Sequence, residues 1–407
     1  MQTDRHAPGS APRRPYRPSR AMRLLLALAE RIAIGTIDVE LPDGTRRVFA
    51  GETDGPRVQL AIHRDRLARR FLMGGKLGFC EAYLDGDWSS PDVEALFRFF
   101  LVNTDALRAE MQGRLWYRFA QRLVHTFRPN SREGAKRNIA RHYDLGNEFY
   151  RTWLDPTMTY SSAVFDRPTD DDLAAAQTRK YEAMARRLGL GERDEVLEIG
   201  CGWGGFAEFA GMRGARVTAI TISRAQWEFA RERMAKAGLA ERVDVQLRDY
   251  RDVDQRFDKI ASIEMFEAVG ERWWPTFFHS LRENLKPGGR AGLQVITINH
   301  RDFLHYRRSM DYIQKYIFPG GMLPSPKALK RGLDAAGLRL RDWSSFGPDY
   351  ARTLRTWNAR FQAAWPRIEA TGFDQRFKRM WEQYFHYCAA GFSVGTIDVA
   401  QIAVDRD

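Results

Sequence analysis

The sequence lacks an apolar run long enough to cross a bilayer. Its best candidate, Leu24 to Ala29, is flanked by Arg23 and Glu30, whereas a membrane-spanning helix needs about 20 apolar residues. The first 20 residues carry five arginines and several prolines but no apolar core, so they do not resemble a secretion signal. We therefore expect a flexible basic arm at residues 1–20 and no membrane-spanning segment.

The chain also has little cysteine. Cys80, Cys201 and Cys388 lie far apart and lack the spacing of metal ligands. An odd number of widely spaced cysteines argues against a disulfide framework or a zinc site and is typical of a reducing compartment. The sequence therefore predicts a cytoplasmic protein without a metal site.

Composition indicates a globular protein with a basic surface. Hydrophobic residues make up 44% of the chain and charged residues 29%, which excludes a largely disordered protein. At 407 residues the chain is too long for one ordinary core, so we expect two domains. Lysine and arginine outnumber aspartate and glutamate by 64 to 52. An anionic membrane surface or nucleic acid would attract such a charge, and an ordinary basic composition is the third interpretation.

The first domain is predicted to mix helix and strand. Residues 21–34 place apolar side chains around a short helix, which either packs on its own domain or lies on a membrane surface. Strand-like segments at 36–41 and 45–49 flank Pro42-Asp43-Gly44, a hairpin signal, and residues 58–62 can add a third strand. A polar, basic segment with proline and glycine at 127–138 predicts a boundary. The domains are then 21–128, a candidate for lipid binding or dimerisation, and 129–407.

The second domain alternates between strand and helix. Short apolar segments at 196–199, 217–222, 243–247, 257–263 and 291–298 are strand-like, and helical stretches separate the early ones. This pattern predicts an α/β fold with a doubly wound, mostly parallel, Rossmann-like sheet.

A glycine-rich loop follows the first of these strands. The segment VLEIGCGWGGF (196–206) places Gly200, Gly202 and Gly204 between a strand and a helix. Glycine permits a tight turn and close approach of the backbone to a ligand, and the helix N-terminus offers unpaired N–H groups. The loop alone would equally admit a nicotinamide dinucleotide, since Gly200, Gly202 and Gly205 fit that pattern too.

Neighbouring polar residues favour S-adenosylmethionine as the ligand. Glu198 precedes the loop, where a carboxylate can steady it or face the cationic methionyl end of the donor. Asp249 ends the third strand, in place to accept from an adenine amino group, and Tyr250 can stack on that ring. The second strand ends without the acidic residue that usually binds a ribose, so we assign that contact to Ser223 and Gln226.

Nine ordered segments carry a resemblance to a known family. They are GFCEAYLDGDW (78–88), RHYDLGNEFYRTWLDPTMTYSSA (141–163), VLEIGCGWGGF (196–206), TISRAQ (221–226), RDYRD (248–252), MFEAVG (265–270), LKPGG (285–289), QKYIFPGGMLPS (314–325) and FHYCAAGF (385–392). In these segments the chain resembles the cyclopropane fatty acid synthases, S-adenosylmethionine-dependent methyltransferases that act on double bonds of phospholipid acyl chains. The resemblance implies a seven-stranded methyltransferase sheet and adds Tyr160, Ser161 and Thr221 to the donor site.

The resemblance also implies a base site, which this sequence alters. In cyclopropane synthases a bicarbonate ion serves as the base, held by a cysteine, a glutamate, a histidine and a tyrosine. Only the glutamate is kept, as Glu267, and the other three positions align with Ser162, Gln294 and Asn358. Such a site would hold bicarbonate less strongly. Glu264 stands where cyclopropane synthases tend to carry a small residue, and we expect it to be the base itself.

The altered base site favours one of two products. Attack of the alkene on the donor methyl leaves a carbocation; removal of a proton from the new methyl closes a cyclopropane, whereas removal from the chain after a hydride shift leaves a methylene-branched or methylated alkene. The site resembles the branch that makes the unsaturated product, with ring closure as the alternative. A reductase or desaturase would then act before or after, and the enzyme would work at the inner face of an anionic phospholipid membrane, either alone or as a homodimer.

Three other functions stay open from sequence. One is methylation of a soluble amine or natural product, since relatives of this fold carry a similar glycine loop. A second is RNA methylation, but no nucleic-acid module or N-P-P-Y-type tetrapeptide follows the fourth strand, so we expect no nucleic-acid partner. The third is a lipid-binding protein that has lost activity.

Overall fold

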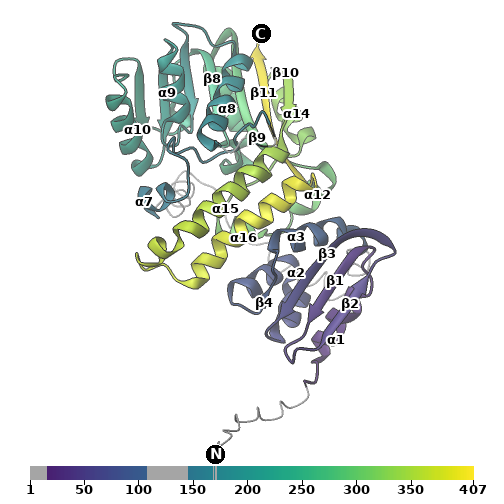
Figure 1. Ribbon diagram of the computed structural model, residues 1–407. Coiled ribbons are helices and arrows are strands. Elements are labelled where there is room, and N and C mark those ends of the chain that lie inside the picture. Colours follow the sequence, from purple (N-terminus) through teal and green to yellow (C-terminus); the bar gives the residue numbers. More distant parts are fainter. Residues whose placement is uncertain (1–15, 108–144, 168, 170–171) are drawn as a thin grey trace, which may run out of the picture. The chain divides into compact units, whose positions relative to one another are not determined.

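The computed structural model describes residues 16–107, 145–167, 169 and 172–407, which form two compact units (Figure 1). The first unit lies within residues 1–117 and the second within 118–407. The domain boundary predicted after residue 128 and residues 1–15 of the predicted basic arm lie outside the described residues.

The first unit has a four-stranded sheet in its described part, with the strand order β2-β1-β3-β4. The predicted hairpin is confirmed by β1 (Ile34–Glu40) and β2 (Arg46–Ala50), which pair antiparallel, while β3 (Thr53–Ile62) runs parallel to β1 and β4 (Trp88–Ser89) closes the edge. Alternate residues of β1 are buried, as expected where one face of a sheet meets a core. The helices α2 (Arg66–Leu84) and α3 (Val93–Val102) belong to the same unit.

The helix predicted at residues 21–34 is α1 (Arg20–Ala29), and Ser19 is its N-cap. Ser19 accepts from the N–H of Met22 and so satisfies one of the unpaired donors of the first turn. Met22, Leu26 and Leu28 are buried. The burial of these side chains supports packing of the helix on its own domain over a position on a membrane surface.

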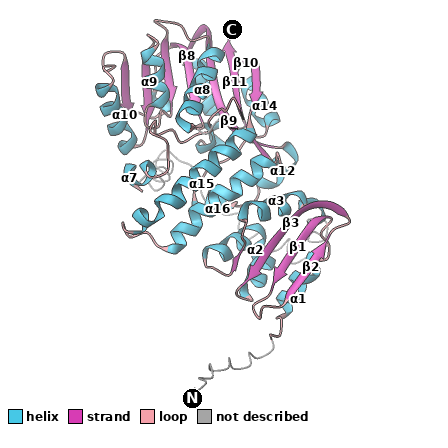
Figure 2. Cartoon of the chain, viewed as in Figure 1, coloured by secondary structure: helices cyan, strands magenta, loops and turns pink. Residues whose placement is uncertain are grey.

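The second unit is built on a sheet that has seven strands in the described residues, in the order β10-β11-β9-β8-β5-β6-β7 (Figure 2). Its parallel strands are β5 (Glu195–Ile199), β6 (Arg216–Thr221), β7 (Val243–Leu247), β8 (Phe257–Ile263) and β9 (Leu285–Ile298). Each overlaps a predicted strand, which confirms the doubly wound α/β fold. Beyond β9, β11 (Ile397–Arg406) pairs antiparallel with β9, and β10 (Leu338–Ser345) pairs antiparallel with β11. Neither strand was predicted from the sequence.

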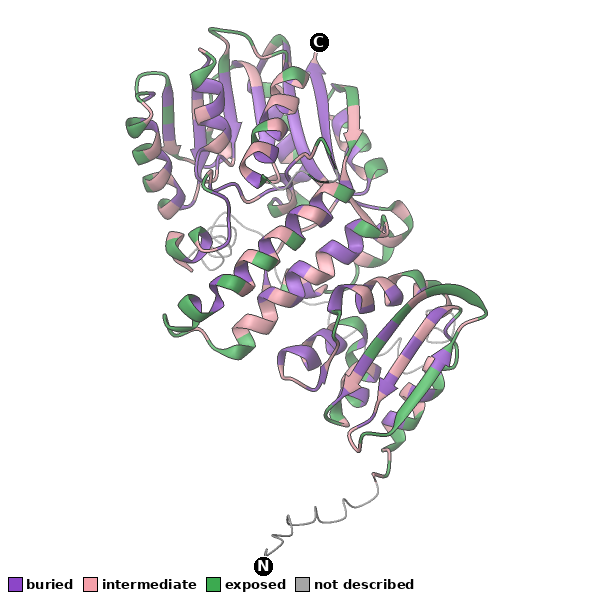
Figure 3. Ribbon diagram, viewed as in Figure 1, coloured by how far each residue is buried: buried purple, intermediate pink, exposed green. Residues whose placement is uncertain are grey.

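Helices cover both faces of this sheet. The helices α8 (Leu173–Leu188), α9 (Gly205–Met212) and α10 (Arg224–Lys236) share one apolar core, and α11 (Trp274–Glu283) and α14 (Pro326–Ala335) share another. The adjacent residues Val196 and Leu197 of β5 belong to different cores, because successive side chains of a strand point to opposite faces. The central strands are accordingly buried between the helical layers, whereas the edge strands β7 and β10 are partly exposed (Figure 3).

Two long helices lie at the edge of the sheet where the parallel strands end. They are α15 (Gly347–Glu369) and α16 (Gln375–Ser393), which pack side by side (Figure 1). Aromatic rings fill the space between them and α7 (Gly146–Arg151): Phe149 of α7 contacts Phe361 of α15 and Trp381 of α16. No helix in the described parts of the chain is long and apolar enough to span a membrane.

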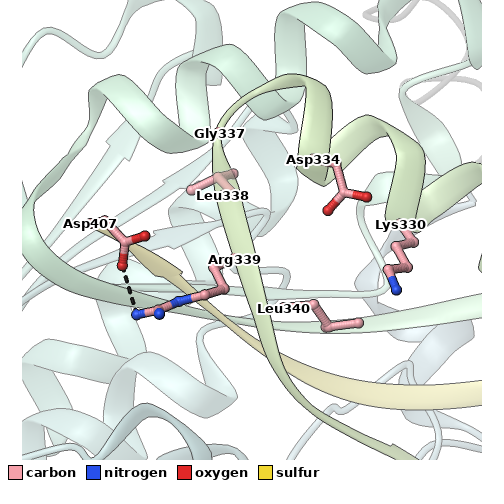
Figure 4. Close-up of a pocket in the computed structure, with 7 residues that line it drawn as sticks. All are labelled: Lys330, Asp334, Gly337, Leu338, Arg339, Leu340 and Asp407. Atoms are coloured by element: carbon pink, nitrogen blue, oxygen red, sulfur yellow. Dashed lines mark ion pairs between the residues drawn. The ribbon is translucent and has the colours of Figure 1, made fainter.

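A surface hollow of about 450 Å³ lies at the opposite edge of the sheet (Figure 4). Its lining includes Lys330 of α14, Leu338 at the start of β10 and Asp407, and Arg339 pairs with Asp407 at 2.7 Å. Open α/β sheets bind ligands at the carboxyl ends of their parallel strands. The hollow lies at the amino ends of the parallel strands and is therefore not where an active site is expected.

Candidate active site

The glycine loop joins β5 to α9 in a left-handed backbone conformation. Gly200, Gly202 and Gly204 have φ angles of +82°, +53° and +83°, which residues other than glycine rarely adopt. A Cβ at Gly200 would lie 2.5 Å from Cγ of Met265, so this end of the loop packs tightly on the segment after β8. At Gly202 no atom of the described residues lies within 4 Å of such a Cβ. The loop thus presents open space at Gly202, next to the N-terminus of α9.

Glu198 is buried under this loop. Its side chain accepts a hydrogen bond from the backbone of Ala207 in α9, and burial raises its pKa to about 8 although Lys180 and Arg233 act in the opposite direction. The second carboxylate oxygen, Oε2, is buried without a hydrogen-bond partner among the described residues. A buried acceptor without a partner is costly. Together with the open space at Gly202, this oxygen fits a site for a cationic ligand.

The predicted ribose contacts lie at the end of β6 and the start of α10. The hydroxyl of Thr221 donates to Oε1 of Gln226 at 3.0 Å, and Oγ of Ser223 accepts from the N–H of Gln226 as the N-cap of α10. All three side chains are buried. The structure brings them together, and their hydrogen bonds show that they also shape the helix start.

Asp249 and Tyr250 follow β7, as predicted, but Asp249 already has a strong partner. Both of its carboxylate oxygens accept from the guanidinium of Arg251, at 2.8 and 2.6 Å. The sequence reasoning missed this ion pair. Oδ1 also accepts from the backbone N–H of Arg251 at 3.0 Å, so these bonds fix the orientation of Asp249. Tyr250 packs its ring against Phe277 at 5.5 Å.

The segment of Tyr160, Ser161 and Ser162 runs beside the carboxyl ends of the strands. The hydroxyl of Tyr160 donates to the hydroxyl of Tyr384 at 3.1 Å, and its ring lies 5.3 Å from that of Trp357. Ser161 and Ser162 are buried. This segment therefore joins an aromatic wall to the polar residues described next.

Glu264 is the centre of a hydrogen-bonded cluster. Its Oε1 accepts from the N–H of Ser162 at 2.9 Å and from Nε2 of Gln294 at 2.7 Å. Its Oε2 accepts from the hydroxyl of Tyr350 at 2.6 Å. Three predicted residues, Ser162, Glu264 and Gln294, are thus brought together by three different segments of the chain.

Glu264 also has an unusual backbone. Its φ is +51°, in the left-handed region that costs a side chain other than glycine about 1–2 kcal/mol. The residue directly follows β8, and its N–H donates to the carbonyl of Gln294 at 2.8 Å. Strain of this kind tends to be kept where it places a functional group. Here it directs the carboxylate to the three donors.

Glu267 lies close to Glu264 but in a different environment. Its Oε1 accepts from the N–H of Ile296, and its Oε2 is buried without a hydrogen-bond partner in the described parts of the chain. Burial and the neighbouring charge of Glu264 raise the pKa of Glu267 to about 8. Burial also raises the pKa of Glu264, while its three hydrogen-bond donors and Lys180 act in the opposite direction. Of the two carboxyl groups, Glu264 is the better stabilised as an anion.

The cluster does not fit a bicarbonate ion. The donors that would face such an anion are the N–H of Ser162, the amide of Gln294 and the hydroxyl of Tyr350, and all three bind the carboxylate of Glu264 instead. A second anion beside this carboxylate would meet like charge without compensating donors. The carboxylate of Glu264 therefore takes the donors that a bound anion would need.

Asn358, the fifth predicted residue of the base site, forms its hydrogen bonds with other residues. Its amide contacts Nε2 of His386 at 3.2 Å and Gln362 at 3.3 Å. The phenol of the cluster comes from Tyr350, eight residues earlier in α15, which the sequence reasoning missed. A usable signal was its spacing of seven residues from Trp357, which places the two buried rings on one helix face.

Two further buried residues of the site were missed. Lys180 of α8 has no exposed surface, and its Nζ donates to Oγ of Ser161 at 2.6 Å. Gln401 of β11 donates to Oε1 of Gln294 at 3.0 Å. Lys180 lies at a buried position of an amphipathic helix, between Ala176 and Met184. A charged residue on this apolar face could have identified Lys180 as a candidate site residue.

The known proteins that are similar to this chain point to one family. A family model described as mycolic acid cyclopropane synthetase matches residues 130–402. The chain is 41% identical to the tuberculostearic acid methyltransferase of Mycobacterium tuberculosis over 95% of its length and 91% of that protein. It is 37% identical to the cyclopropane-fatty-acyl-phospholipid synthase of Escherichia coli, covering 83% of this chain and 85% of that one.

The chain belongs to the cyclopropane synthase family. Among solved structures, it is similar to the mycolic acid cyclopropane synthase CmaA1 complexed with SAH and CTAB, with 30% identity and a TM-score of 0.62 over 69% of this chain and 99% of that one. The protein is therefore an S-adenosylmethionine-dependent enzyme with the methyltransferase fold, as predicted. It belongs with the methyltransferases and cyclopropane synthases of unsaturated fatty acyl chains.

Proposed function

We propose that the enzyme methylates the double bond of an unsaturated fatty acyl chain of a membrane phospholipid and leaves an unsaturated, methylene-branched or C-methylated product. The observation that carries this proposal is the carboxylate of Glu264, which takes all three donors of the base site. Because this base is part of the chain, its carboxylate has a fixed position relative to the substrate, whereas a bound ion can move. The similarity to a tuberculostearic acid methyltransferase over nearly the whole chain supports methyl transfer as the reaction.

The donor site is assigned to the glycine loop and its neighbours. Gly200, Gly202 and Gly204 let the backbone approach the donor, and Glu198 faces its cationic methionyl end. Asp249 and Tyr250 bind the adenine, while Thr221, Ser223 and Gln226 line the ribose side. Tyr160 and Ser161 complete the site. Bound here, S-adenosylmethionine supplies an electrophilic methyl group.

Glu264 then decides the product. When the alkene forms its new bond to the methyl carbon, the bond from that carbon to the donor sulfur breaks, S-adenosylhomocysteine is the leaving group, and the neighbouring chain carbon becomes cationic. A hydride shift moves the positive charge along the chain, and Glu264 accepts a proton from a carbon beside it. The electron pair of that C–H bond forms the new double bond, so charge and atoms balance. Tyr350 and Gln294 hold the carboxylate as an anion until this proton arrives.

An aromatic wall supports the transient cation. The ring of Tyr160 lies 5.4 Å from Trp153, 5.3 Å from Trp357 and 6.1 Å from Phe318. A desolvated cation over an aromatic face gains about 0.5–2 kcal/mol. The same rings exclude water, which would otherwise trap the cation as an alcohol.

We propose that the enzyme binds its phospholipid substrate at the cytoplasmic face of an anionic membrane. The segment after β9 supports membrane binding. Its helix α12 (His300–Tyr306) begins at the carboxyl end of β9 and carries exposed Leu304, and exposed Arg308 and Met310 follow. Apolar and basic side chains together match an anionic lipid surface. A methylene product would need a separate reductase to become a saturated branch, and we propose such a partner.

The test is a product assay. Purified enzyme is incubated with S-adenosylmethionine and vesicles of a cis-monounsaturated phospholipid, and the fatty acid methyl esters are analysed by mass spectrometry with location of the double bond. The proposal predicts a chain heavier by one methylene unit that keeps one double bond. A saturated cyclopropane chain would refute the assigned product, and no product from any acyl chain would refute acyl methylation.

Ring closure is the second candidate, supported by the 37% identity to a cyclopropane-fatty-acyl-phospholipid synthase. Ring closure differs in that the base removes a proton from the new methyl group without a preceding hydride shift. Methylation of a soluble amine has weaker support: the likeness to coclaurine N-methyltransferase, at 18% identity and a TM-score of 0.62, concerns the fold alone. The product assay separates the first from the main proposal, and salt-sensitive binding to anionic vesicles separates the second.

A further inference from the structure

Lys180 is a fully buried lysine of α8 that the proposed chemistry does not yet use. Its Nζ donates to Oγ of Ser161 at 2.6 Å and lies 4.3 Å from the centre of the Tyr181 ring. Burying an ammonium group is costly, and an apolar side chain of similar volume often replaces such a group without loss of stability. Filling space therefore does not explain why a lysine stands here.

Two hydrogen-bonded paths run from the backbone and side chain of Lys180 to Glu264. In the first, Nζ binds the side chain of Ser161, and the N–H of the next residue, Ser162, donates to Oε1 of Glu264. The carbonyl of Ser161 is held from the same helix, by Nε2 of Gln177 at 2.9 Å. Helix α8 thus fixes the segment that presents the N–H of Ser162 to the base.

The second path passes through two glutamines. Nε2 of Gln401 donates to the carbonyl of Lys180 at 3.1 Å and to Oε1 of Gln294 at 3.0 Å. Because the oxygen of the Gln294 amide is engaged in this way, its NH₂ group points to Glu264, which it binds at 2.7 Å. The two paths meet at Oε1 of Glu264 and so form a closed ring.

The charges around this ring have opposite signs. Glu264, Asp155 and Glu198 each act on Lys180 and favour its ammonium form, against the burial that lowers its pKa to about 7. Glu264 faces Lys180, the hydroxyl of Tyr350 and the like charge of Glu267. An ammonium group here favours the anionic form of Glu264, which a proton-accepting base requires.

We propose that Lys180 is a positioning residue that keeps the base of the reaction ionised and in place: it fixes the Ser161–Ser162 segment and supplies the positive charge that favours the Glu264 carboxylate. This inference rests on the assignment of Glu264 as the base. Lys180 itself does not contact the reacting atoms in this account.

The test compares Lys180→Met, which removes charge and hydrogen bond, with Lys180→Gln, which keeps a donor for Ser161 but removes the charge. Lys286→Met is the control, since Lys286 pairs with Glu195 and Asp258 at the opposite end of the strands. Two readouts are followed against pH: the rate of methyl transfer, and the infrared band of the protonated carboxyl group that Glu264→Gln removes. Thermal unfolding confirms that each variant is folded.

Both Lys180 variants should raise the titration midpoint of Glu264 by about one pH unit or more, and the acid limb of the rate profile should move with it. The control should leave both unchanged. A midpoint that stays at the wild-type value in either Lys180 variant would overturn the proposal. The infrared readout needs no turnover, so an enzyme that methylates no acyl chain would refute the proposed function and still leave this inference measurable.

Discussion

The hydroxyl of Tyr350 donates a 2.6 Å hydrogen bond to Oε2 of Glu264. Tyr350 belongs to α15, whereas Glu264 follows β8 in a left-handed conformation, so the bond joins the helical layer at the sheet edge to the residue proposed as the base. Because Ser162 and Gln294 bind the other oxygen, the carboxylate is held on both sides.

Tyr350→Phe should therefore weaken catalysis without weakening donor binding. A hydrogen bond to a charged group is worth about 1.5–3 kcal/mol, which corresponds to a fall in kcat of about 10- to 100-fold. The acid limb of the pH profile should move up, because the Glu264 anion loses a donor. The matched control is Asn358→Ala in the same helix, which should change kcat little; the opposite ranking of the two variants would restore Asn358 to the base site.

Gly202→Ala should weaken binding of S-adenosylmethionine by about tenfold or more, the equivalent of about 1.4 kcal/mol or more. The new methyl group would project into the open space of the donor site and would strain a residue at φ +53°. Gly238→Ala is the control, since Gly238 has φ +68° and equal open space but lies between α10 and β7. Calorimetric titration should show normal affinity for the control, and similar losses in both variants would contradict the assignment of the loop.

The stability of the enzyme should fall as pH rises from about 5 to about 8. The pKa of Glu267 is raised from 4.5 to about 8 by burial, so the folded state binds more protons than the unfolded state within this window, and stability decreases through it. Glu198 contributes with the same sign. Glu267→Gln should flatten the decline in thermal midpoint, whereas Glu241→Gln at an exposed position should leave it unchanged. An equally steep decline in Glu267→Gln would show that Glu267 is not the cause.

Binding to anionic vesicles should depend on the segment after β9. Arg308→Glu combined with Leu304→Ser removes a basic and an apolar contact and should weaken co-sedimentation by about fivefold or more, given about 1 kcal/mol for each basic residue at such a surface. Lys330→Glu, at the hollow on the opposite edge of the sheet, changes the net charge equally and serves as the control (Figure 4). Equal weakening by both charge changes would indicate a general effect of net charge instead of a docking segment.

The sequence predicted the sheet well because its central strands are continuous apolar segments bounded by turns, as buried parallel strands must be. It missed β10 and β11, whose pairing is antiparallel and depends on contacts distant in the chain. In the site, it predicted the residues that lie in local motifs, such as Gly202 and Glu264. It missed those set by tertiary packing, Lys180, Tyr350 and Gln401. Helical spacing can mark Lys180 and Tyr350 as buried, but it does not state which strand end their helices face.

If the side chain of Glu264 replaces a bound anion as the base, a small anion should rescue a variant that lacks the carboxylate. Glu264→Gly relieves the strain at φ +51° and exposes the three donors that the carboxylate now occupies. Glu264→Gln keeps the space filled with a neutral amide.

Both variants should lose about 100-fold or more of the rate of methyl transfer, in line with the loss of a general base. Added formate, acetate or bicarbonate should restore product formation in Glu264→Gly, in proportion to the concentration of the anion, and should leave Glu264→Gln inactive. Full activity of Glu264→Gln, or rescue of both variants alike, would contradict the assignment of Glu264 as the base.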